Sequence, residues 1–517
     1  MKNTKVLWVD DEIDLLKPHI MFLQLKGIVV LTSNNGNEAL EIIKKEEPEI
    51  VFLDENMPGM SGLETLTEIK KINTFLPVVM ITKSEEEHIM DNALGSNITD
   101  YLIKPVNPNQ IWLSIKKIIE NEDLISKRTT QVYQREFREL NLEIMDARNF
   151  NDWENIYKKL VTWEMKLEKA SDEGISDILI QQKHEANLQF SKFIIKNYPE
   201  WLKIENNDMP LMSHTALKDR VFPTLKDNKC TFLIVIDNLR FDQWRMLEPF
   251  FRQYYNIASE DICCSILPSV TQYARNALFA GLMPSVIEKK YPQYWKNENE
   301  EGNKNDFESE LLTEYMKRYG LNYKHHYAKV LNADFGKKIT DTIHQHIRNP
   351  LNVVIYNFVD MLSHARTDVD LIRELASDEA AYRSVTASWF EHSPLFELIK
   401  VLADKKIPLF ITADHGSVRV QNPVKIIGDK STNTNLRYKV GKSIEVNAKD
   451  VFEVRNPESI FLPKINVSSS FVFARNNDFF AYPNNYNYYV NYYKDTFQHG
   501  GISMEEMMVP FINLVPK

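Results

Sequence analysis

Residues 1–120 alternate short apolar runs with longer stretches in which apolar residues recur at helical spacing. The apolar runs predict five strands: Lys5–Val9, Ile28–Thr32, Ile50–Leu53, Val78–Ile81 and Asp100–Ile103. Stretches such as Asn37–Glu46 and Gly62–Lys71 lie between these runs and predict helices. Five strands that alternate with helices are typical of a doubly wound parallel sheet, in which the ligand site lies at the carboxyl ends of the strands.

Residues 121–205 carry a different pattern. Apolar residues keep helical spacing in Gln131–Ala147 and Trp153–Ala170, and proline is absent from residues 109 to 198. This pattern predicts a small helical bundle.

After residue 206 the α/β pattern returns, with predicted strands at Cys230–Ile236, Val353–Phe358 and Pro408–Thr412. We therefore predict three domains, residues 1–120, 121–205 and 206–517. The late segment Asn477–Asn491 is rich in Asn and Tyr, and we interpret it as strands and loops of the last domain.

The composition fits a multidomain globular chain that can bury several cores, with 43% hydrophobic and 26% charged residues. The formal net charge of −10 argues against a protein that coats nucleic acid along its whole surface. Three cysteines without a CxxC pair provide neither a disulfide framework nor a zinc ribbon. Because the acidic N-terminus lacks an apolar signal core and no run of about 18 apolar residues occurs, we expect a cytoplasmic protein without a membrane span.

Five polar residues lie at the ends of the strands predicted in residues 1–120: Asp10, Asp11, Asp54, Thr82 and Lys104. In the flavodoxin-like strand order 2-1-3-4-5 these strand ends converge. Three carboxylates at one site repel one another unless a cation binds there, and oxygen ligands suit Mg²⁺. Asp54 can then attack a phosphoryl donor as a nucleophile, while Lys104 neutralises the acyl phosphate and Thr82 hydrogen-bonds to it.

These five positions, in this order and at these strand ends, resemble a response-regulator receiver domain over all of residues 1–120. The resemblance implies that Asp10, Asp11 and Asp54 hold Mg²⁺ together with the main-chain carbonyl of Asn56. It also implies that a sensor histidine kinase phosphorylates Asp54. For any one of these acids taken alone, a solvated strand end is the alternative interpretation.

The same resemblance implies a switch. Thr82 and Lys104 would respond to the phosphoryl group, Tyr101 would swing inward, and the Lys104–Pro105 peptide bond would be cis. Phosphorylated receivers would then pair into a homodimer through the face near Tyr101 and the helix at about residues 108–119.

The last domain carries acids and histidines at or near its predicted strand ends: Asp237, Asp360, His364, Asp414, His415 and His499. Asp360 and His364 are four residues apart, so they share one face of a helix. Asp/His sets bind Zn²⁺ or Mn²⁺ rather than Mg²⁺ alone, because imidazole prefers the softer ions. Two such sets indicate two metals that clamp the oxygens of an in-line displacement.

A hydroxyl nucleophile is predicted at Thr271, where a helix begins after a proline, and Ser269 is the competing candidate. A helix N-terminus offers N–H groups and positive dipole to a phosphate, and metal coordination deprotonates the hydroxyl. Arg275 follows one helical turn later and is predicted to clamp a substrate phosphate together with the neighbouring Asn276.

Three segments of this domain resemble the PglZ branch of the alkaline phosphatase superfamily: IDNLRFDQW at 236–244, VTQYARNALFAGLMP at 270–284 and FQHGGISMEEMMVP at 497–510. The resemblance covers about residues 207–517 and implies two Zn²⁺ ions, or Mn²⁺, with Thr271 as phosphoacceptor. The first ion would be held by Asp237, Thr271, Asp414 and His415. The second would be held by Asp360, His364 and His499.

Other polar and aromatic residues are not assigned to either site. The histidines at 325, 326, 344 and 346 are interpreted as polar surface, with the substrate cleft as the alternative. Arg240 and Arg366 are further candidates for phosphate clamps. The tyrosines of residues 479–493 are interpreted as core packing, with base stacking as the alternative.

The order of receiver, helical segment and PglZ-like domain resembles the family of PorX-like response regulators, which is linked to type IX protein secretion. It implies a regulator whose receiver controls a metal-dependent phosphodiesterase for nucleotides or short oligonucleotides. A sigma factor or a secretion-system component is an implied partner, whereas no helix-turn-helix pattern indicates direct binding to duplex DNA. The alternatives are a catalytically weak scaffold for such partners and a phosphomonoesterase or phosphomutase.

Overall fold

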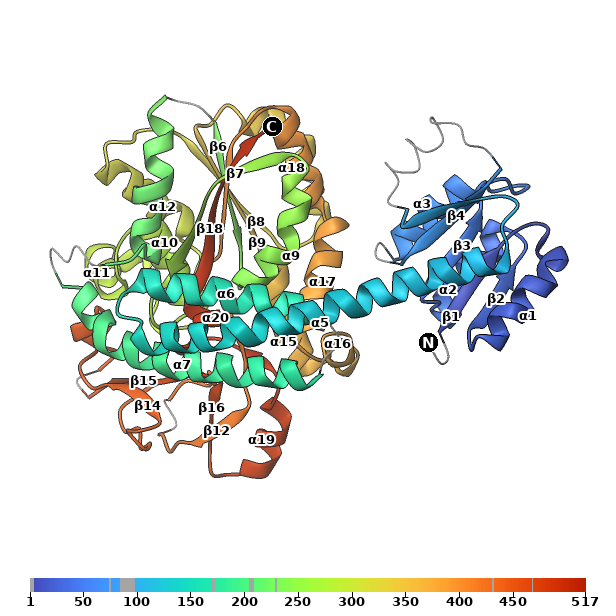
Figure 1. Cartoon of the computed structure of the whole chain (residues 1–517). Coiled ribbons are helices and arrows are strands. Elements are labelled where there is room, and N and C mark those ends of the chain that lie inside the picture. The colour runs from blue at the N-terminus through green and yellow to red at the C-terminus, as the bar shows by residue number, and fades with distance from the viewer. Residues whose placement is uncertain are drawn as a thin grey trace. The chain divides into compact units, whose positions relative to one another are not determined.

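The computed structural model describes residues 4–73, 76–83, 98–168, 173–203, 209–227, 230–429, 432–466 and 468–517. The chain forms two compact units, Met1–Val132 and Tyr133–Lys517, and the division falls inside helix α5 (Pro108–Asp146). Figure 1 shows both units and labels many of their elements. Within the described residues, no helix combines the length and the apolar content that a membrane span requires.

The first unit contains a parallel five-stranded sheet in the order β2-β1-β3-β4-β5, which confirms the predicted flavodoxin-like receiver fold. Its strands are β1 Lys5–Val9, β2 Val29–Ser33, β3 Ile50–Asp54, β4 Val78–Thr82 and β5 Asp100–Ile103. Its described helices are the 3-10 turn η1 Ile13–Leu16, α1 Lys17–Leu25, α2 Gly36–Glu46, α3 Gly62–Ile72 and the first part of α5.

The side chains of this sheet form two hydrophobic cores, one on each face, because successive residues of a strand point to opposite faces. Trp8 and Phe52 pack in the core that includes Ile111 of α5. Leu7 packs in the other core, with Leu66 of α3. Helices therefore cover both faces of the sheet, and polar side chains collect at the strand ends.

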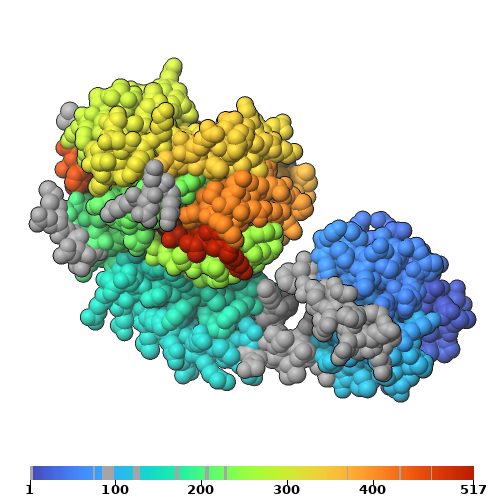
Figure 2. All heavy atoms as spheres, turned by 90° about the horizontal axis from the view of Figure 1, so that it is seen from above, coloured from blue at the N-terminus to red at the C-terminus, as the bar shows by residue number. Residues whose placement is uncertain are grey.

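Helices α5, α6 (Phe150–Glu168) and α7 (Glu173–Trp201) confirm the predicted helical middle region. Asn149 and Asp152 start α6 by exchanging hydrogen bonds, in which each backbone N–H donates to the other's side chain. The rings of Trp153 in α6 and Phe190 in α7 meet edge to face with centroids 5.4 Å apart. In the space-filling view α6, α7 and the part of α5 that belongs to the second unit, in cyan and green-blue, lie along one flank of the α/β part of that unit (Figure 2).

The α/β part of the second unit is built on a six-stranded sheet in the order β7-β18-β10-β6-β9-β8. The strands are β6 Thr231–Ile236, β7 Tyr255–Cys264, β8 His325–Val330, β9 Leu351–Tyr356, β10 Leu409–Thr412 and β18 Met508–Pro516. The four strands β10, β6, β9 and β8 are parallel, and β18 and β7 add an antiparallel edge. Strands β6, β9 and β10 are buried throughout, so their carboxyl ends deliver polar residues from a rigid core.

Helices and single turns flank this sheet. The first group is α8 Ser213–Ala216, the π-helical turn η2 Leu217–Val221, η3 Phe222–Asp227, α9 Phe241–Arg252, α10 Thr271–Ala280, α11 Pro284–Lys290, η4 Pro292–Tyr294 and α12 Glu308–Arg318. The second group is α13 Ala333–Asp341, α14 Ile343–His346, α15 Phe358–Asp368, α16 Asp370–Leu375, α17 Glu379–Glu391, α18 Pro394–Asp404 and α20 Met504–Met507.

Small sheets complete the domain. They contain β11 Val418–Arg419 with β17 Phe497–Gln498, β12 Asn422–Lys425 with β16 Asp478–Ala481, and β13 Tyr438–Gly441, β15 Ser470–Ala474 and β14 Val451–Val454, beside the turn η5 Pro457–Ile460.

The prediction of strands and loops for Asn477–Asn491 is wrong in part, because β16 is followed by helix α19 (Tyr486–Tyr493). The core-packing interpretation of the tyrosines holds in part: Tyr486 and Tyr493 of α19 are partly buried and pack against the hydrophobic cluster that contains Phe479. Tyr488 is 65% exposed and does not belong to the core. Rings four residues apart stack instead, with 6.1 Å between the centroids of Tyr488 and Tyr492. This i, i+4 packing favours the helix over the strand propensity of tyrosine.

Candidate metal and phosphoryl-transfer sites

The first unit brings three carboxylates and one ammonium group together at the strand ends. Asp10 follows β1, Asp54 ends β3, and Lys104 follows β5. Lys104 Nζ lies 2.9 Å from Asp10 Oδ2 and 3.0 Å from Asp54 Oδ1. Asp10, Asp11 and Asp54 can each place a carboxylate oxygen within 4.8 Å of the others. Burial raises the pKa of Asp54, although Lys104 opposes this shift.

The remaining receiver residues lie around this cluster. The Thr82 hydroxyl donates a hydrogen bond to the carboxylate of Glu55. Tyr101 is 42% exposed, so its ring is turned to solvent rather than inward. Asn56 is exposed, two residues after Asp54. The Lys104–Pro105 peptide bond is cis, as the resemblance implies. These positions fit an unphosphorylated switch, and the roles of the residues stay predictions.

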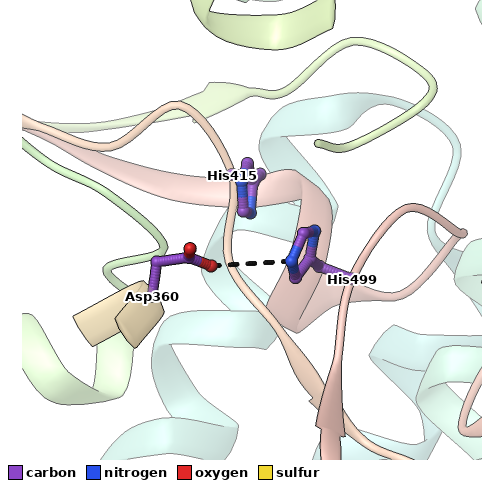
Figure 3. Close-up of side chains that lie close together, drawn as sticks. All are labelled: Asp360, His415 and His499. Atoms are coloured by element: carbon purple, nitrogen blue, oxygen red, sulfur yellow. Dashed lines mark ion pairs between the residues drawn. The ribbon is translucent and has the colours of Figure 1, made fainter. Parts of the chain in front are cut away.

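In the second unit, Asp360, His415 and His499 form one set of possible metal ligands (Figure 3). Asp360 lies in the first turn of α15, His415 follows β10, and His499 follows β17. Asp360 Oδ1 is 3.5 Å from His499 Nε2, and the two imidazole rings stack with centroids 4.3 Å apart. Pairing of β11 with β17 holds the two histidine-bearing turns side by side.

A second set consists of Asp237, Asp414 and His415. His415 therefore belongs to both sets. Thr271 is the first residue of α10, and its Oγ1 lies 3.0 Å from His415 Nε2 and 3.4 Å from Asp237 Oδ1. The structure thus places the predicted nucleophile at a helix N-terminus and beside the atoms of the second set.

The pKa values of these carboxyl and imidazole groups are shifted by burial and by one another's charges. Burial and the charge of Asp237 raise the pKa of Asp414 to about 7. Burial likewise raises the pKa of Asp360, with Asp237 adding to the shift. Burial and the charge of His415 lower the pKa of His499 well below its usual range. Carboxylates packed together with a neutral imidazole form a donor set that a divalent cation would stabilise.

One atom of these sets tests whether the residues fit a metal. Asp414 Oδ2 is buried without a hydrogen-bond partner. An orphaned acceptor of this kind is costly unless another group binds it. Two Asp/His donor sets, one of them with an unsatisfied buried carboxylate oxygen, therefore fit divalent ions such as Zn²⁺ or Mn²⁺.

His364 lies outside the set formed by Asp360, His415 and His499. Its Nε2 is 3.6 Å from Asp360 Oδ2, as expected for positions four apart on α15, but its ring centroid is 5.8 Å from that of His499. The side chain is 64% exposed. His364 therefore lies at the solvent side of the first set, within reach of Asp360.

The two predicted substrate residues are buried and occupied by protein groups. Arg275 Nη1 lies 2.6 Å from Asp237 Oδ2, and its Nε lies 2.8 Å from Glu308 Oε1. Asn276 donates from Nδ2 to the carbonyls of Gln272 and Lys304. In this structure Arg275 thus holds a carboxylate of the second candidate ligand set, and its predicted contact with substrate stays a prediction.

The competing candidate Ser269 is also occupied. Its hydroxyl donates to the carbonyl of Gly501 at 2.9 Å and accepts from the N–H of Gly500 at 3.2 Å. Ser269 is fully buried, so its hydroxyl ties the start of α10 to the turn after His499. This arrangement favours Thr271 as the reactive hydroxyl.

The other candidate clamps have structural partners as well. Arg240 is buried and pairs with Asp242 and Glu379, and Arg366 donates to the carbonyls of Ala376, Ser377 and Asp495.

Sequence reasoning gave no role to Glu308, which pairs with both Arg275 and Lys329. It lies between the motifs at 270–284 and 497–510, in a stretch where no motif marked it. Glu506 was also missed, although it stands inside a quoted motif. Its carboxylate pairs with Arg437 at 2.6 Å, and neither side chain is exposed.

Three family models match the chain in sequence order. A response regulator receiver domain matches residues 6–116, a PorX response regulator linker domain matches residues 123–202, and the BREX system PglZ alkaline phosphatase-like domain matches residues 216–514. With the sheet order and the strand-end carboxylates, these matches define a response regulator whose receiver precedes an alkaline-phosphatase-like domain. The chain belongs to the PglZ alkaline-phosphatase-like family, whose model covers more than half of it, and its three domains form a PorX-like architecture.

Curated relatives match the receiver end of the chain. The transcriptional regulatory protein CpxR homolog of Haemophilus influenzae is 34% identical over 166 residues, which are 32% of this chain and 70% of that protein. The alkaline phosphatase synthesis transcriptional regulatory protein PhoP of Bacillus subtilis is 30% identical over 124 residues, which are 24% of this chain and 51% of that protein. The chain thus spans about half the length of the second relative.

Among solved structures, the chemotaxis protein CheY4 of Vibrio cholerae is 29% identical, with 22% of this chain and 97% of that chain covered and a TM-score of 0.21. The receiver domain itself implies a sensor kinase as partner, and the alkaline-phosphatase-like domain places the chain in a superfamily of phosphoesterases. Both domain types commonly bind divalent metal ions.

Proposed function

We propose that this protein is a response regulator, phosphorylated on Asp54, that controls a metal-dependent phosphodiesterase for nucleotides or short oligonucleotides. The observation that carries the proposal is the position of Thr271. Its hydroxyl lies at the N-terminus of α10, 3.0 Å from a histidine that belongs to two ligand sets.

The proposed chemistry starts from this hydroxyl. One ion would be held by Asp237, Thr271, Asp414 and His415, and the other by Asp360, His364 and His499. When bound, the ions supply Lewis-acid stabilisation of the phosphoryl oxygens and lower the pKa of a coordinated hydroxyl. Thr271 Oγ1 attacks phosphorus and displaces one alcohol, and water then hydrolyses the threonine ester to release a phosphomonoester. The N-terminus of α10, with its partial positive charge, would face the phosphoryl oxygens during both steps.

The first experiment is metal analysis of the purified chain, with turnover of bis(p-nitrophenyl) phosphate and p-nitrophenyl phosphate measured in parallel. We expect about two Zn or Mn per chain, as two-metal sites require, and a preference for the diester. A strong preference for the monoester would favour the phosphomonoesterase or phosphomutase alternative. Absence of both metal and turnover would contradict the enzymatic proposal.

The proposed control step begins at the receiver. A sensor histidine kinase would phosphorylate Asp54, with Mg²⁺ held by Asp10, Asp11, Asp54 and the Asn56 carbonyl. The added charge would draw Thr82 and Lys104 together and turn Tyr101 inward. Light scattering with beryllofluoride bound tests the homodimer, and a mass that stays monomeric would contradict it.

The scaffold alternative keeps the same domains but assigns the signal to bound partners. The variant Asp414→Ala separates the two, because it removes a carboxylate of the second ligand set. If that variant folds and still signals in cells, the scaffold is supported over the enzyme. A cytoplasmic location, the domain limits 1–120, 121–205 and 206–517, a link to type IX secretion, and a sigma factor or secretion component as partner stay parts of the proposal.

A further inference from the structure

We propose that Asn187, in linker helix α7, is a positioning residue through which the linker holds the histidine ligands of the metal site. The inference rests on the proposed function for the metal site itself. Among the described residues, the hydrogen bonds of Asn187 go to none of the ligands. Asn187 is almost fully buried, at 4% exposure.

The Asn187 side chain uses both ends of its amide on one short segment. Its Oδ1 accepts a hydrogen bond from the backbone N–H of Met504 at 2.8 Å, and its Nδ2 donates to Glu505 Oε2 at 2.9 Å. The other carboxylate oxygen of Glu505 lies 3.8 Å from Lys183, one turn earlier on α7. These contacts fix the start of α20, which is itself only four residues long.

Residues 504–506, which we call the hub, hydrogen-bond to the turns that carry both histidines of the metal site. The hub begins five residues after His499, and the N–H of Gly501 donates to Glu506 Oε1 at 2.9 Å. The N–H of Gly416, next to His415, donates to the carbonyl of Glu506 at 2.9 Å. A shift of residues 504–506 would therefore move both histidines.

Close packing makes the contact between residues 504–506 and the His415 turn rigid. A Cβ atom added to Gly416 would lie 2.0 Å from the carbonyl oxygen of Glu505, so the backbone of the His415 turn rests directly on the hub. The hub cannot move toward that turn without displacing it, because dense interiors transmit strain.

Helix α7 is held from its other side by α5. Gln182 accepts a hydrogen bond from the hydroxyl of Tyr133 at 2.9 Å and donates to Asn141 Oδ1 at 2.7 Å. Both partners belong to the part of α5 that lies in the second unit. Helix α7 thus links the part of α5 in the second unit, through Gln182, to the turns that carry the metal ligands, through Asn187.

The test swaps the amide and the carboxylate between Asn187 and Glu505. Asn187→Asp keeps the acceptor for Met504 but sets a carboxylate against Glu505. The double variant Asn187→Asp with Glu505→Gln restores a donor and an acceptor and preserves the total charge. Asn197→Asp is the matched control, since within the described part of the chain the Asn197 amide donates only to the carbonyl of Phe193 in its own helix.

Zn²⁺ affinity by chelator competition is the primary measurement, with kcat and KM for the diester as the second. We expect Asn187→Asp to weaken Zn²⁺ binding by about 10- to 100-fold, the usual cost of losing a residue that orients metal ligands. The double variant should bind at least about tenfold more tightly than Asn187→Asp, while Asn197→Asp should match the wild type. Asn187→Asp should lower kcat for the diester and leave KM nearly unchanged.

Wild-type Zn²⁺ affinity in a folded Asn187→Asp chain would overturn the inference, as would a double variant no better than the single one. If Asn187→Asp does not fold, Asn187→Ser replaces it, since it removes both hydrogen bonds without adding charge. Zn²⁺ affinity at the wild-type level in Asn187→Ser would then also overturn it. If the wild type binds Zn²⁺ but hydrolyses no diester, the proposed function fails while the affinity comparison still decides the role of Asn187.

Discussion

The Thr271 hydroxyl lies 3.0 Å from Nε2 of His415, and His415 is the one side chain that both ligand sets share among the described residues. The two residues are 144 positions apart in the chain. The proposed nucleophile, three carboxylates and a second histidine therefore meet around a single buried imidazole. This convergence is the geometry that activation of a hydroxyl at a metal centre requires.

The hydroxyl of Thr271 can be removed without changing the shape of the side chain. We expect Thr271→Val to lower kcat for the diester by at least about a thousandfold, as loss of a nucleophile does, with metal content unchanged. Thr271→Ser keeps a hydroxyl at the same atom and should retain much of the activity. Normal turnover by Thr271→Val, with metals retained, would rule out Thr271 as nucleophile.

Lys104 joins two receiver carboxylates, and its ammonium would also face the phosphoryl group. We expect Lys104→Met to weaken beryllofluoride binding about tenfold to a hundredfold, because a hydrogen bond to a charged group is worth about 1.5–3 kcal/mol. The exposed Lys117, which pairs with Asp100, supplies the control Lys117→Met. Titration followed by Trp fluorescence measures both, and equal affinities would contradict the assigned role.

The buried pair of Arg437 and Glu506 should dominate the stability of the hub. Arg437 Nε and Nη2 lie 3.0 and 2.6 Å from the two carboxylate oxygens of Glu506. We expect Arg437→Met to lower the free energy of unfolding by about 3–5 kcal/mol, because Glu506 would remain buried without its partner. Arg455→Met removes an exposed arginine paired with Glu453 and should leave stability nearly unchanged. Urea unfolding of the full chain compares the two.

His214 should make the second unit sensitive to acid. Burial, with a contribution from Lys218, lowers the pKa of His214 to about 4, and its Nδ1 has no hydrogen-bond partner. Between pH 6.5 and 4 the His214 ring therefore stays unprotonated in the folded state, whereas the same ring is protonated in the unfolded chain. Stability falls as the pH falls through this window, by about 2 kcal/mol between pH 7 and pH 5.

The variant His214→Gln should show a correspondingly smaller loss of stability between pH 7 and pH 5. His392→Gln removes an exposed histidine and controls for the loss of one imidazole. Urea unfolding at the two pH values gives the comparison. The same pH dependence in wild type and His214→Gln would show that the buried ring is not responsible.

Much of the receiver fold and site could be predicted from the sequence, because neighbours along the chain mark its strands and its functional residues. Each strand is a short apolar run, and each functional residue follows a run directly, as Asp54 follows Ile50–Leu53. The parallel order then brings the strand ends to one edge. The segment Asn477–Asn491 shows the limit of such reading, since the strand propensity of tyrosine lost to ring stacking along α19.

The sequence by itself determined the domain types, the strand-end acids of both sites and the start of a helix at Thr271. Only the tertiary structure decided that both ligand sets share His415 and that Arg275 is enclosed by Asp237 and Glu308. It alone also set Asn187 against a turn more than three hundred residues away. The physical reason is range: periodicity and motifs report neighbours along the chain, whereas these contacts arise when separate elements pack and their buried polar groups must find partners.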